Sequence, residues 1–190
     1  MPDAAQPLVG QLSLFGGGPS APEGLRYYPD FITGTEEQQL IEHARSLPLS
    51  PFQFGVYEGR RRVMYFGSKY DFTHQRLEPA EPIPAWLMPL IVRVELLANL
   101  SRGSIVHARG TEYDTGAGIG WHRDKKQFDL VFGLSLGSPC SFRFRREAGP
   151  KWQRFTLDAQ PRSLYLMQGP ARSEWEHSIP AVEAPRYSIT

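Results

Sequence analysis

The sequence has almost no cysteine: among 190 residues, Cys140 is the single thiol. One thiol cannot form an intrachain disulfide, which excludes a disulfide-stapled scaffold and favours a reducing compartment. No basic segment followed by an apolar one marks a secretory signal near the N-terminus. The longest apolar stretch, residues 86–100, is interrupted by proline and by charged and amide side chains, so it cannot span a bilayer. We therefore expect a cytoplasmic protein with no membrane partner.

An excess of charge of one sign is also missing. The 21 basic and 20 acidic residues leave a formal net charge of +1, so no overall field draws the chain toward nucleic acid. Any such binding would need a local basic patch. Three clusters qualify by sequence, although each taken alone is better explained as a solvated surface: Arg60–Arg62, Lys125–Lys126, and Arg143 with Arg145 and Arg146.

Hydrophobic periodicity is absent from residues 1–24, which are rich in proline, glycine, alanine and serine. This composition predicts a disordered tail in front of a single domain over 25–190. Within the tail, Gln11–Phe15 reads QLSLF and resembles the peptide by which bacterial replication and repair proteins bind the sliding clamp. The alternative is that its apolar residues fold back onto the domain as an edge strand.

Two helices are expected in residues 25–103, the part of the domain that precedes the main strands. Thr35–Gln38 reads TEEQ and fits a capping box, and the apolar residues behind it predict a helix over 35–46. A second helix is predicted over about 84–98, with a kink at Pro89.

Aromatic and basic residues alternate between these helices. Residues 52–56 and 59–67 predict a hairpin that turns at Glu58–Gly59, and His74 follows in a polar loop with no partner at ligand spacing. Rings interleaved with arginine are typical of surfaces on which flipped bases stack, although an aromatic core hairpin explains them equally well. The candidate substrate residues are Tyr65, Phe66, Tyr70 and Met167 for stacking or the pocket, with Arg62 and Lys126 for charge.

Residues 104–190 contain a series of short runs with β-type composition, each bounded by glycine, proline or charge. Many short strands at regular spacing favour two facing sheets over a parallel α/β sheet. The pattern therefore predicts a mostly β (α+β) fold, a double-sheet barrel or jelly roll (double-stranded β-helix) over 104–190, with the two helices packed on its outside.

One stretch, Gly118–Asp124, carries the chemistry and reads GIGWHRD. His122 and Asp124 are two residues apart, so on an extended strand both side chains point to the same face. A second histidine follows at His177, and two histidines with one carboxylate form the facial triad of non-haem Fe(II) oxygenases. An H-x-D pair alone is a weak signal, more often a salt bridge or a capping contact. The surrounding sequence therefore decides its meaning.

Four segments of that surrounding sequence read TEYDTGAGIGWHRDK, LSLGSPCSFRFR, RSLYLMQGPARSEWEHSIP and RYSIT. Together they cover most of 104–190 and resemble the AlkB family of Fe(II)- and 2-oxoglutarate-dependent dioxygenases. The resemblance implies a jelly roll, with residues 25–103 as the nucleotide-recognition region. It also implies that His122, Asp124 and His177 bind Fe(II), which uses 2-oxoglutarate and O2.

The co-substrate contacts follow from the same resemblance. Arg186 would pair with the distal carboxylate of 2-oxoglutarate, as a planar guanidinium does well, and Tyr113 would hydrogen-bond the same molecule. The family's asparagine two residues before that tyrosine is Thr111 here, whose side chain has a shorter reach. The family's closing motif also continues to a second arginine beyond Thr190, and we expect a missing tail rather than an altered mechanism.

The function that the resemblance implies is oxidative demethylation of N-alkylated bases in DNA, with release of formaldehyde, succinate and CO2. Flipping a base costs a few kcal/mol, and least where alkylation already prevents pairing, which favours 1-methyladenine and 3-methylcytosine. Two alternatives remain open. One is the same chemistry on tRNA, other RNA or a methylated protein, and the other is a metal-binding jelly-roll module without turnover.

Overall fold

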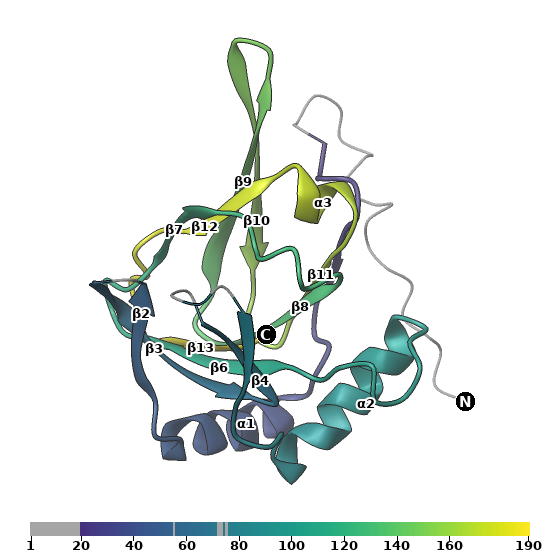
Figure 1. Ribbon diagram of the computed structural model, residues 1–190, viewed down its shortest axis with the longest axis vertical. Coiled ribbons are helices and arrows are strands. Elements are labelled where there is room, and N and C mark those ends of the chain that lie inside the picture. The colour runs from purple at the N-terminus through teal and green to yellow at the C-terminus, as the bar shows by residue number, and fades with distance from the viewer. Residues whose placement is uncertain (1–19, 55, 72–73, 75) are drawn as a thin grey trace.

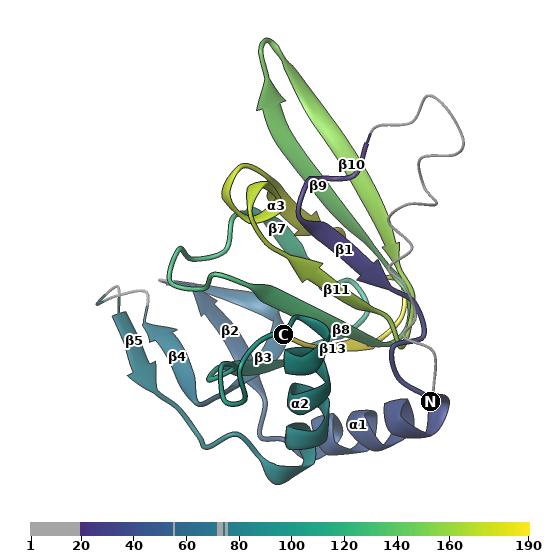
Figure 2. The same ribbon diagram turned by 90° about the vertical axis from the view of Figure 1, so that its right-hand side faces the viewer.

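The computed structural model describes residues 20–54, 56–71, 74 and 76–190. Most of the predicted tail, including the Gln11–Phe15 peptide, lies outside the described residues. The described chain forms two facing antiparallel sheets of seven and four strands, with two helices against the outer face of the larger sheet (Figure 1, Figure 2). The predicted jelly roll, mostly β with two external helices, is confirmed.

The larger sheet takes strands from both halves of the chain, and every neighbouring pair in it is antiparallel. In spatial order the strands are β1 (Leu25–Tyr28), β11 (Leu164–Met167), β8 (Val131–Gly137), β13 (Arg186–Ile189), β6 (Ala108–Tyr113), β3 (Tyr57–Phe66) and β2 (Ser50–Phe54).

The smaller sheet carries the two histidines of the predicted triad. Its order is β10 (Lys151–Ala159), β9 (Cys140–Ala148), β12 (Glu176–Ile179) and β7 (Ile119–His122). β9 and β10 pair along their full length, and their hairpin extends past the rest of the molecule in Figure 1. A separate two-stranded sheet joins β4 (Ser68–Asp71) to β5 (Arg76–Pro79). Strands of four residues such as β4, β5 and β12 are too short to show a period in the sequence.

The central strands of the larger sheet are mostly buried on both faces, and alternate residues of each strand pack into different layers. In β8, Leu134 and Leu136 belong to the core cluster that packs against the helices. Between them, Ser135 is equally buried but reaches Arg186 on the other face. The inner face thus holds polar side chains that the helices never touch, and it is this face that looks toward the smaller sheet.

The first helix, α1 (Gly34–Ser46), begins at Gly34, whereas the sequence predicts a start at residue 35. Its N-cap is Thr33, whose hydroxyl accepts from the Glu36 amide at 3.2 Å while the Glu36 carboxylate accepts from the Thr33 amide at 2.8 Å. The predicted cap at Thr35 is therefore wrong. Both threonines have an acidic or amide side chain three residues later, but only Thr33 precedes the helix, with Gly34 as its first residue.

Two other local predictions need correction. A short 3₁₀ turn, η2 (Ala85–Leu87), precedes α2 (Met88–Leu97), so Pro89 falls in the first turn, where its missing N–H breaks no helical bond and causes no kink. The β2–β3 hairpin turns between Phe54 and Tyr57, which are paired, and not at Glu58–Gly59. None of the helices in the described part of the chain has the length and apolar character needed to cross a membrane.

Candidate metal centre and co-substrate site

His122 and His177 face each other directly across two strands of the smaller sheet. The antiparallel register pairs His177 of β12 with His122 of β7, and their ring centroids are 4.3 Å apart. Residues opposite each other in such a pair project from the same face, with Cβ atoms about 5 Å apart. The close approach needs Gly118, because a Cβ at that position would lie 2.7 Å from the carbonyl oxygen of Ile179. Strand pairing therefore brings together two histidines that are distant in sequence.

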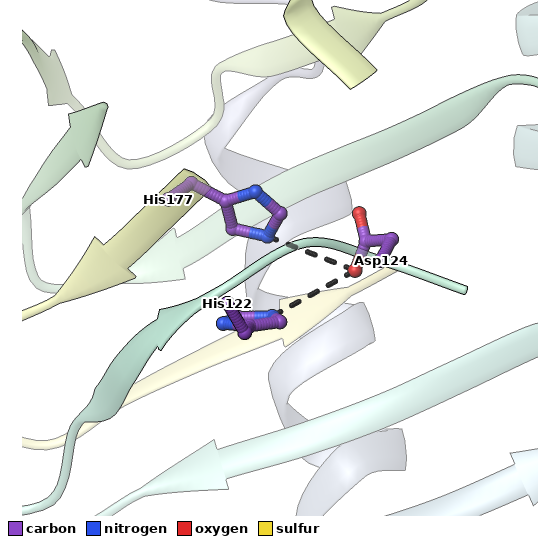
Figure 3. A group of neighbouring side chains, drawn as sticks. All are labelled: His122, Asp124 and His177. Carbon is purple, nitrogen blue, oxygen red and sulfur yellow. Dashed lines mark ion pairs between the residues drawn. The ribbon is translucent and has the colours of Figure 1, made fainter. Parts of the chain in front are cut away.

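Asp124 completes the group, although it follows the end of β7 instead of lying within it as expected. Figure 3 shows both imidazoles directed toward its carboxylate. The Oδ1 atom lies 3.7 Å from Nε2 of His122 and 3.6 Å from Nε2 of His177. These separations exceed a hydrogen bond, while the three ligand atoms all lie within 4.8 Å of one another. The spacing suits three side chains that share one ion.

The tautomer of His122 agrees with a ligand role. Its Nδ1 atom lies 2.9 Å from the carbonyl oxygen of Gly120, to which it donates, so Nε2 carries the lone pair on the side of Asp124. Burial, followed by the neighbouring His177, lowers the pKa of His122 to about 4. The imidazole is therefore neutral at pH 7 and able to bind a cation without first losing a proton.

The carboxyl group of Asp124 is also in the charge state that a metal ligand needs. Burial alone would raise the pKa of Asp124, but the neighbouring His177 and His122 hold it well below its usual range. Two imidazoles and one carboxylate are the donor set that non-haem Fe(II) sites use. One oxygen of that carboxylate, Oδ2, is buried without a hydrogen-bond partner among the described residues. The residues present therefore fit a divalent iron.

Sequence reasoning missed Arg172, which lies behind Asp124. It belongs to the short helix α3 (Pro170–Ser173), and its Nη1 atom lies 3.4 Å from Oδ2 of Asp124. The same guanidinium donates to the carbonyl oxygens of Lys125, at 2.9 Å, and of Phe128. Its side chain is almost fully buried. The only signal in the sequence was a basic residue in the short segment before His177, which does not reveal its partner.

The predicted co-substrate residue Arg186 is buried on the inner face of the larger sheet. Its Nη2 atom donates to Oγ of Ser135 at 2.9 Å, and its guanidinium carbon lies 4.7 Å above the Tyr113 ring. Among the described residues nothing accepts from its Nε or Nη1 atoms, although Arg186 is only 2% exposed. Buried N–H groups are rarely left unpaired, and a guanidinium edge matches a carboxylate. This arrangement fits a bound dicarboxylate.

Thr111 and Ser188 lie beside these residues on adjacent strands. The register pairs Thr111 of β6 with Ser188 of β13, one step of the same face from the Tyr113–Arg186 pair. Both hydroxyls are buried and have no hydrogen-bond partner within the described ranges. Thr111 is thus where the sequence predicts it, with an unused hydroxyl at the inner face.

A cavity of about 440 Å³ joins the predicted metal and co-substrate residues. Its wall includes His122, Asp124, His177, Tyr113 and Arg186. The wall also includes Ser68, Leu77, His107 and Phe128, none of which the sequence predicts as a site residue. Clefts with a few convergent polar groups in an apolar wall are typical of ligand sites.

The predicted substrate residues fit less well, since none is among the described residues that line this cavity. Phe66 is 3% exposed and packs in the core beneath the helices, and Met167 is 1% exposed in the second core cluster. Neither can stack on a base, so these two predictions are wrong. Their apolar character reflects core packing, which a sequence pattern cannot separate from a binding surface.

Arg62 is also placed differently from the prediction. Its guanidinium lies 2.6 Å from the Glu112 carboxylate, on the face of β3 opposite to that of Tyr65. It is therefore an ion-pair residue on the far side of the sheet. Tyr65 lies 6.1 Å from His107 at the cavity, Tyr70 is approached by the Lys125 ammonium at 4.9 Å, and Lys126 is exposed. These last three stay candidates.

The predicted basic patch on β9 is largely neutralised. Arg145 pairs with Glu176 at 2.7 Å and stacks between two tryptophans, while Arg146 pairs with Glu174 at 2.5 Å. Such paired side chains contribute little field to attract a phosphate backbone. The alternative reading of this cluster, as an ordinary solvated surface, is the better one.

A second group of possible ligands lies at the tip of the β4–β5 hairpin. His74 was expected to have no partner, but its Nδ1 atom lies 2.7 Å from the Asp71 carboxylate, and Glu78 is close enough to join them. His74 is exposed, and Arg76 already binds the Glu78 carboxylate at 3.0 Å. An exposed ion-pair group accounts for this arrangement.

Comparison with known proteins identifies the family to which this chain belongs. The family model described as the 2OG-Fe(II) oxygenase superfamily matches residues 24–188, which is most of the chain. The match includes the three residues of the metal centre as well as Tyr113 and Arg186.

Among curated relatives, an Arabidopsis thaliana protein named "Alkylated DNA repair protein ALKBH8 homolog" is 29% identical over 181 residues, which covers 83% of this chain and 51% of the relative. The mouse "tRNA (carboxymethyluridine(34)-5-O)-methyltransferase ALKBH8" is 29% identical over 165 residues, covering 83% and 24%. Human "Alpha-ketoglutarate-dependent dioxygenase alkB homolog 3" is 24% identical over 195 residues, covering 86% and 63%. The chain thus spans about half of the first relative and about a quarter of the second.

Two solved structures have the same fold. The structure of OsALKBH1 superposes with a TM-score of 0.65 at 14% identity, over 89% of this chain and 96% of that one. A Pseudomonas putida prolyl-4-hydroxylase superposes with a TM-score of 0.62 at 13% identity, over 96% and 94%. At such low identity the likeness is one of fold alone.

Proposed function

The chain belongs to the 2OG-Fe(II) oxygenase superfamily, within its AlkB family, and we propose that it removes N-methyl groups from nucleobases by oxidation. The proposal depends most on Arg186, whose buried guanidinium lines the same cavity as the histidine–aspartate group and has two nitrogens, Nε and Nη1, with no acceptor among the described residues. A site that binds only a metal does not need this buried guanidinium, whereas a site that also binds a dicarboxylate co-substrate does.

Each residue has a defined part in this scheme. His122, Asp124 and His177 would hold Fe(II), and Arg186 would pair with the distal carboxylate of 2-oxoglutarate. Tyr113 would donate a hydrogen bond to the same molecule, and Thr111 offers its buried hydroxyl beside it. When bound, iron and 2-oxoglutarate supply the oxidation of the methyl carbon by O2, with release of succinate and CO2. The hydroxymethyl group then leaves the base nitrogen as formaldehyde.

The protein's own contribution is placement and exclusion of water. The smaller sheet positions both histidines through one cross-strand pair, and Arg172 holds the carboxylate. Rings of Phe142 and Phe144 lie 5.3 and 6.2 Å from His177 and keep that side of the site apolar. No described side chain has to act as an acid or base in the oxidation, which is usual where a cofactor carries the chemistry.

Alkylated DNA is the substrate that we propose first, as part of alkylation repair, because the Arabidopsis relative is named for it. RNA is the second candidate, since the mouse relative is named for tRNA. A methylated base in either polymer would have to leave its stack to reach the cavity. The similarity to a prolyl-4-hydroxylase is one of fold alone, at 13% identity, so it does not favour a protein substrate.

The test supplies Fe(II), 2-oxoglutarate and O2 with matched oligonucleotides that carry 1-methyladenine in DNA or in RNA, and with a methylated peptide. We expect formaldehyde and succinate in equal amounts with at least one oligonucleotide. His122→Ala should abolish both products. If the wild-type protein binds iron and 2-oxoglutarate but releases no formaldehyde from any of these substrates, the chain is a binding module and the proposal fails.

Docking on a sliding clamp through Gln11–Phe15 stays a separate proposal, supported by the peptide sequence QLSLF. Deleting these five residues should abolish binding to the clamp and leave turnover of a short oligonucleotide unchanged. Equal clamp affinity with and without the peptide would contradict it.

A further inference from the structure

We propose that His107 reads the edge of the substrate base by accepting a hydrogen bond through Nε2. This selects bases that carry an amino group beside the methylated nitrogen over bases that carry a carbonyl oxygen there. The inference rests on the proposed function, and it assigns a specificity role to a residue outside the metal and co-substrate groups.

The tautomer of His107 follows from its contacts. Its Nδ1 atom lies 2.7 Å from the carbonyl oxygen of Ser68 and 3.2 Å from the Ser68 hydroxyl. A carbonyl oxygen only accepts, so Nδ1 carries the hydrogen, and in the neutral ring Nε2 is left with a lone pair. Burial lowers the pKa of His107, which keeps the ring neutral at pH 7. No described residue donates to Nε2, so that acceptor is available to a ligand.

The position of His107 puts this acceptor in the cavity. The ring lines the same cavity as the metal residues, in the part formed by Leu77, Ile105 and Phe128. The ring centroid of Phe128 lies 4.8 Å from that of His107, with 39° between the ring planes, and the ring centroid of Tyr65 lies 6.1 Å away. A fixed acceptor beside apolar and aromatic side chains orients a flat heterocycle that enters the cavity.

The chemistry of methylated bases gives this acceptor its selectivity. In 1-methyladenine and 3-methylcytosine the carbon next to the methylated nitrogen carries an amino group, which can donate to Nε2. Both bases are cationic, which strengthens such a bond, and a neutral imidazole does not repel them. In 3-methylthymine both carbons next to the methylated nitrogen carry an oxygen, whose lone pairs would oppose that of Nε2. A site that accepts a hydrogen bond from the amino group of one base discriminates strongly against a base that has an oxygen in that place.

A purely structural role for His107 is the competing explanation, since its bond to Ser68 ties β6 to β4. Two amide substitutions separate the roles. In His107→Asn the side-chain NH2 occupies the place of Nδ1 and keeps the bond to Ser68, but nothing reaches the place of Nε2. In His107→Gln the amide reaches the place of Nε2 and can either accept or donate, while the bond to Ser68 is lost.

The experiment measures kcat/KM for formaldehyde release from one oligonucleotide that carries 1-methyladenine or 3-methylthymine. We expect the wild-type protein to prefer 1-methyladenine. His107→Asn should lose about tenfold on 1-methyladenine, the worth of one hydrogen bond, with little change on 3-methylthymine. His107→Gln should retain 1-methyladenine and gain 3-methylthymine, and Phe128→Leu should weaken both alike because stacking does not read the edge.

Two sets of results would overturn the inference. If His107→Asn behaves as wild type while His107→Gln loses both substrates, the histidine is only a tether. If the wild-type protein shows no preference between the two bases, it reads no edge. Affinity for both oligonucleotides is measured in parallel on the anaerobic Fe(II)–2-oxoglutarate form. A binding preference that His107→Asn removes, without formaldehyde from any substrate, would support edge reading and reject the proposed function.

Discussion

The Nη1 atom of Arg172 lies 3.4 Å from Oδ2 of Asp124, and the same guanidinium donates to the backbone carbonyls of the loop that follows Asp124. One side chain therefore supports both the carboxylate and the chain that carries it. Arg172 belongs to α3, which immediately precedes β12 and His177. The segment that delivers the second histidine thus also positions the acidic ligand.

Replacing this support should weaken metal binding. We expect Arg172→Met to lower the affinity for Mn(II), an oxygen-insensitive substitute for Fe(II), by at least tenfold, as is typical when a partner of a metal ligand is lost. Calorimetric titration of the metal-free protein measures it. Arg102→Met, at an exposed arginine, serves as the matched control and should leave the affinity unchanged. Equal affinities of the Arg172 and Arg102 variants would show that Asp124 needs no support.

Arg186 makes a prediction that concerns the co-substrate and not the metal. Arg186→Gln should raise the Kd for 2-oxoglutarate by at least tenfold, because it removes the charge and one edge of the guanidinium, while Mn(II) affinity stays within about twofold. Ser135→Ala, which removes only the partner of Nη2, should have a smaller effect. Binding of 2-oxoglutarate to the metal-loaded protein measures both. An Arg186 variant with wild-type affinity would separate this residue from the co-substrate.

The low pKa of His122 predicts how acid affects the metal-free protein. Its pKa falls from the ordinary 6.5 to about 4 on folding, so between these values the unfolded chain binds a proton that the folded chain does not. The free energy of unfolding must therefore decrease as the pH falls from 6.5 toward 4.

Urea unfolding of the metal-free protein at several values from pH 7 to pH 4.5 tests this sign. His122→Gln should lose less stability over that range than the wild-type protein does. His107 has a pKa lowered by burial and contributes to both curves, so the difference between the curves isolates His122. Parallel curves would mean that burial does not disfavour the charged imidazole of His122.

Some side chains suggest their role from the sequence and others do not. The sequence proposes His122, Asp124 and His177 because a ligand set is a matter of residue type and order along the chain, and it proposes Arg186 through the resemblance to the AlkB family. Phe66 and Met167 could not be assigned in the same way, because an apolar residue has the same pattern in a core as in a pocket. Alternation along the strand already puts Arg62 and Tyr65 on opposite faces, but only the pairing of β3 with β6 places Tyr65 opposite Arg109, which lines the cavity.

The sequence alone determined the mostly β class, which depends on alternation along the strands. It also proposed the three metal ligands from their chemically distinctive side chains, and Arg186 through the resemblance of RYSIT to the AlkB family. The tertiary structure decided which helix cap forms, that Arg172 stands behind Asp124, and that His107 and Phe128 share a wall with the metal centre. These features depend on contacts between segments far apart in sequence, and local propensity carries no information about which strand will lie beside which.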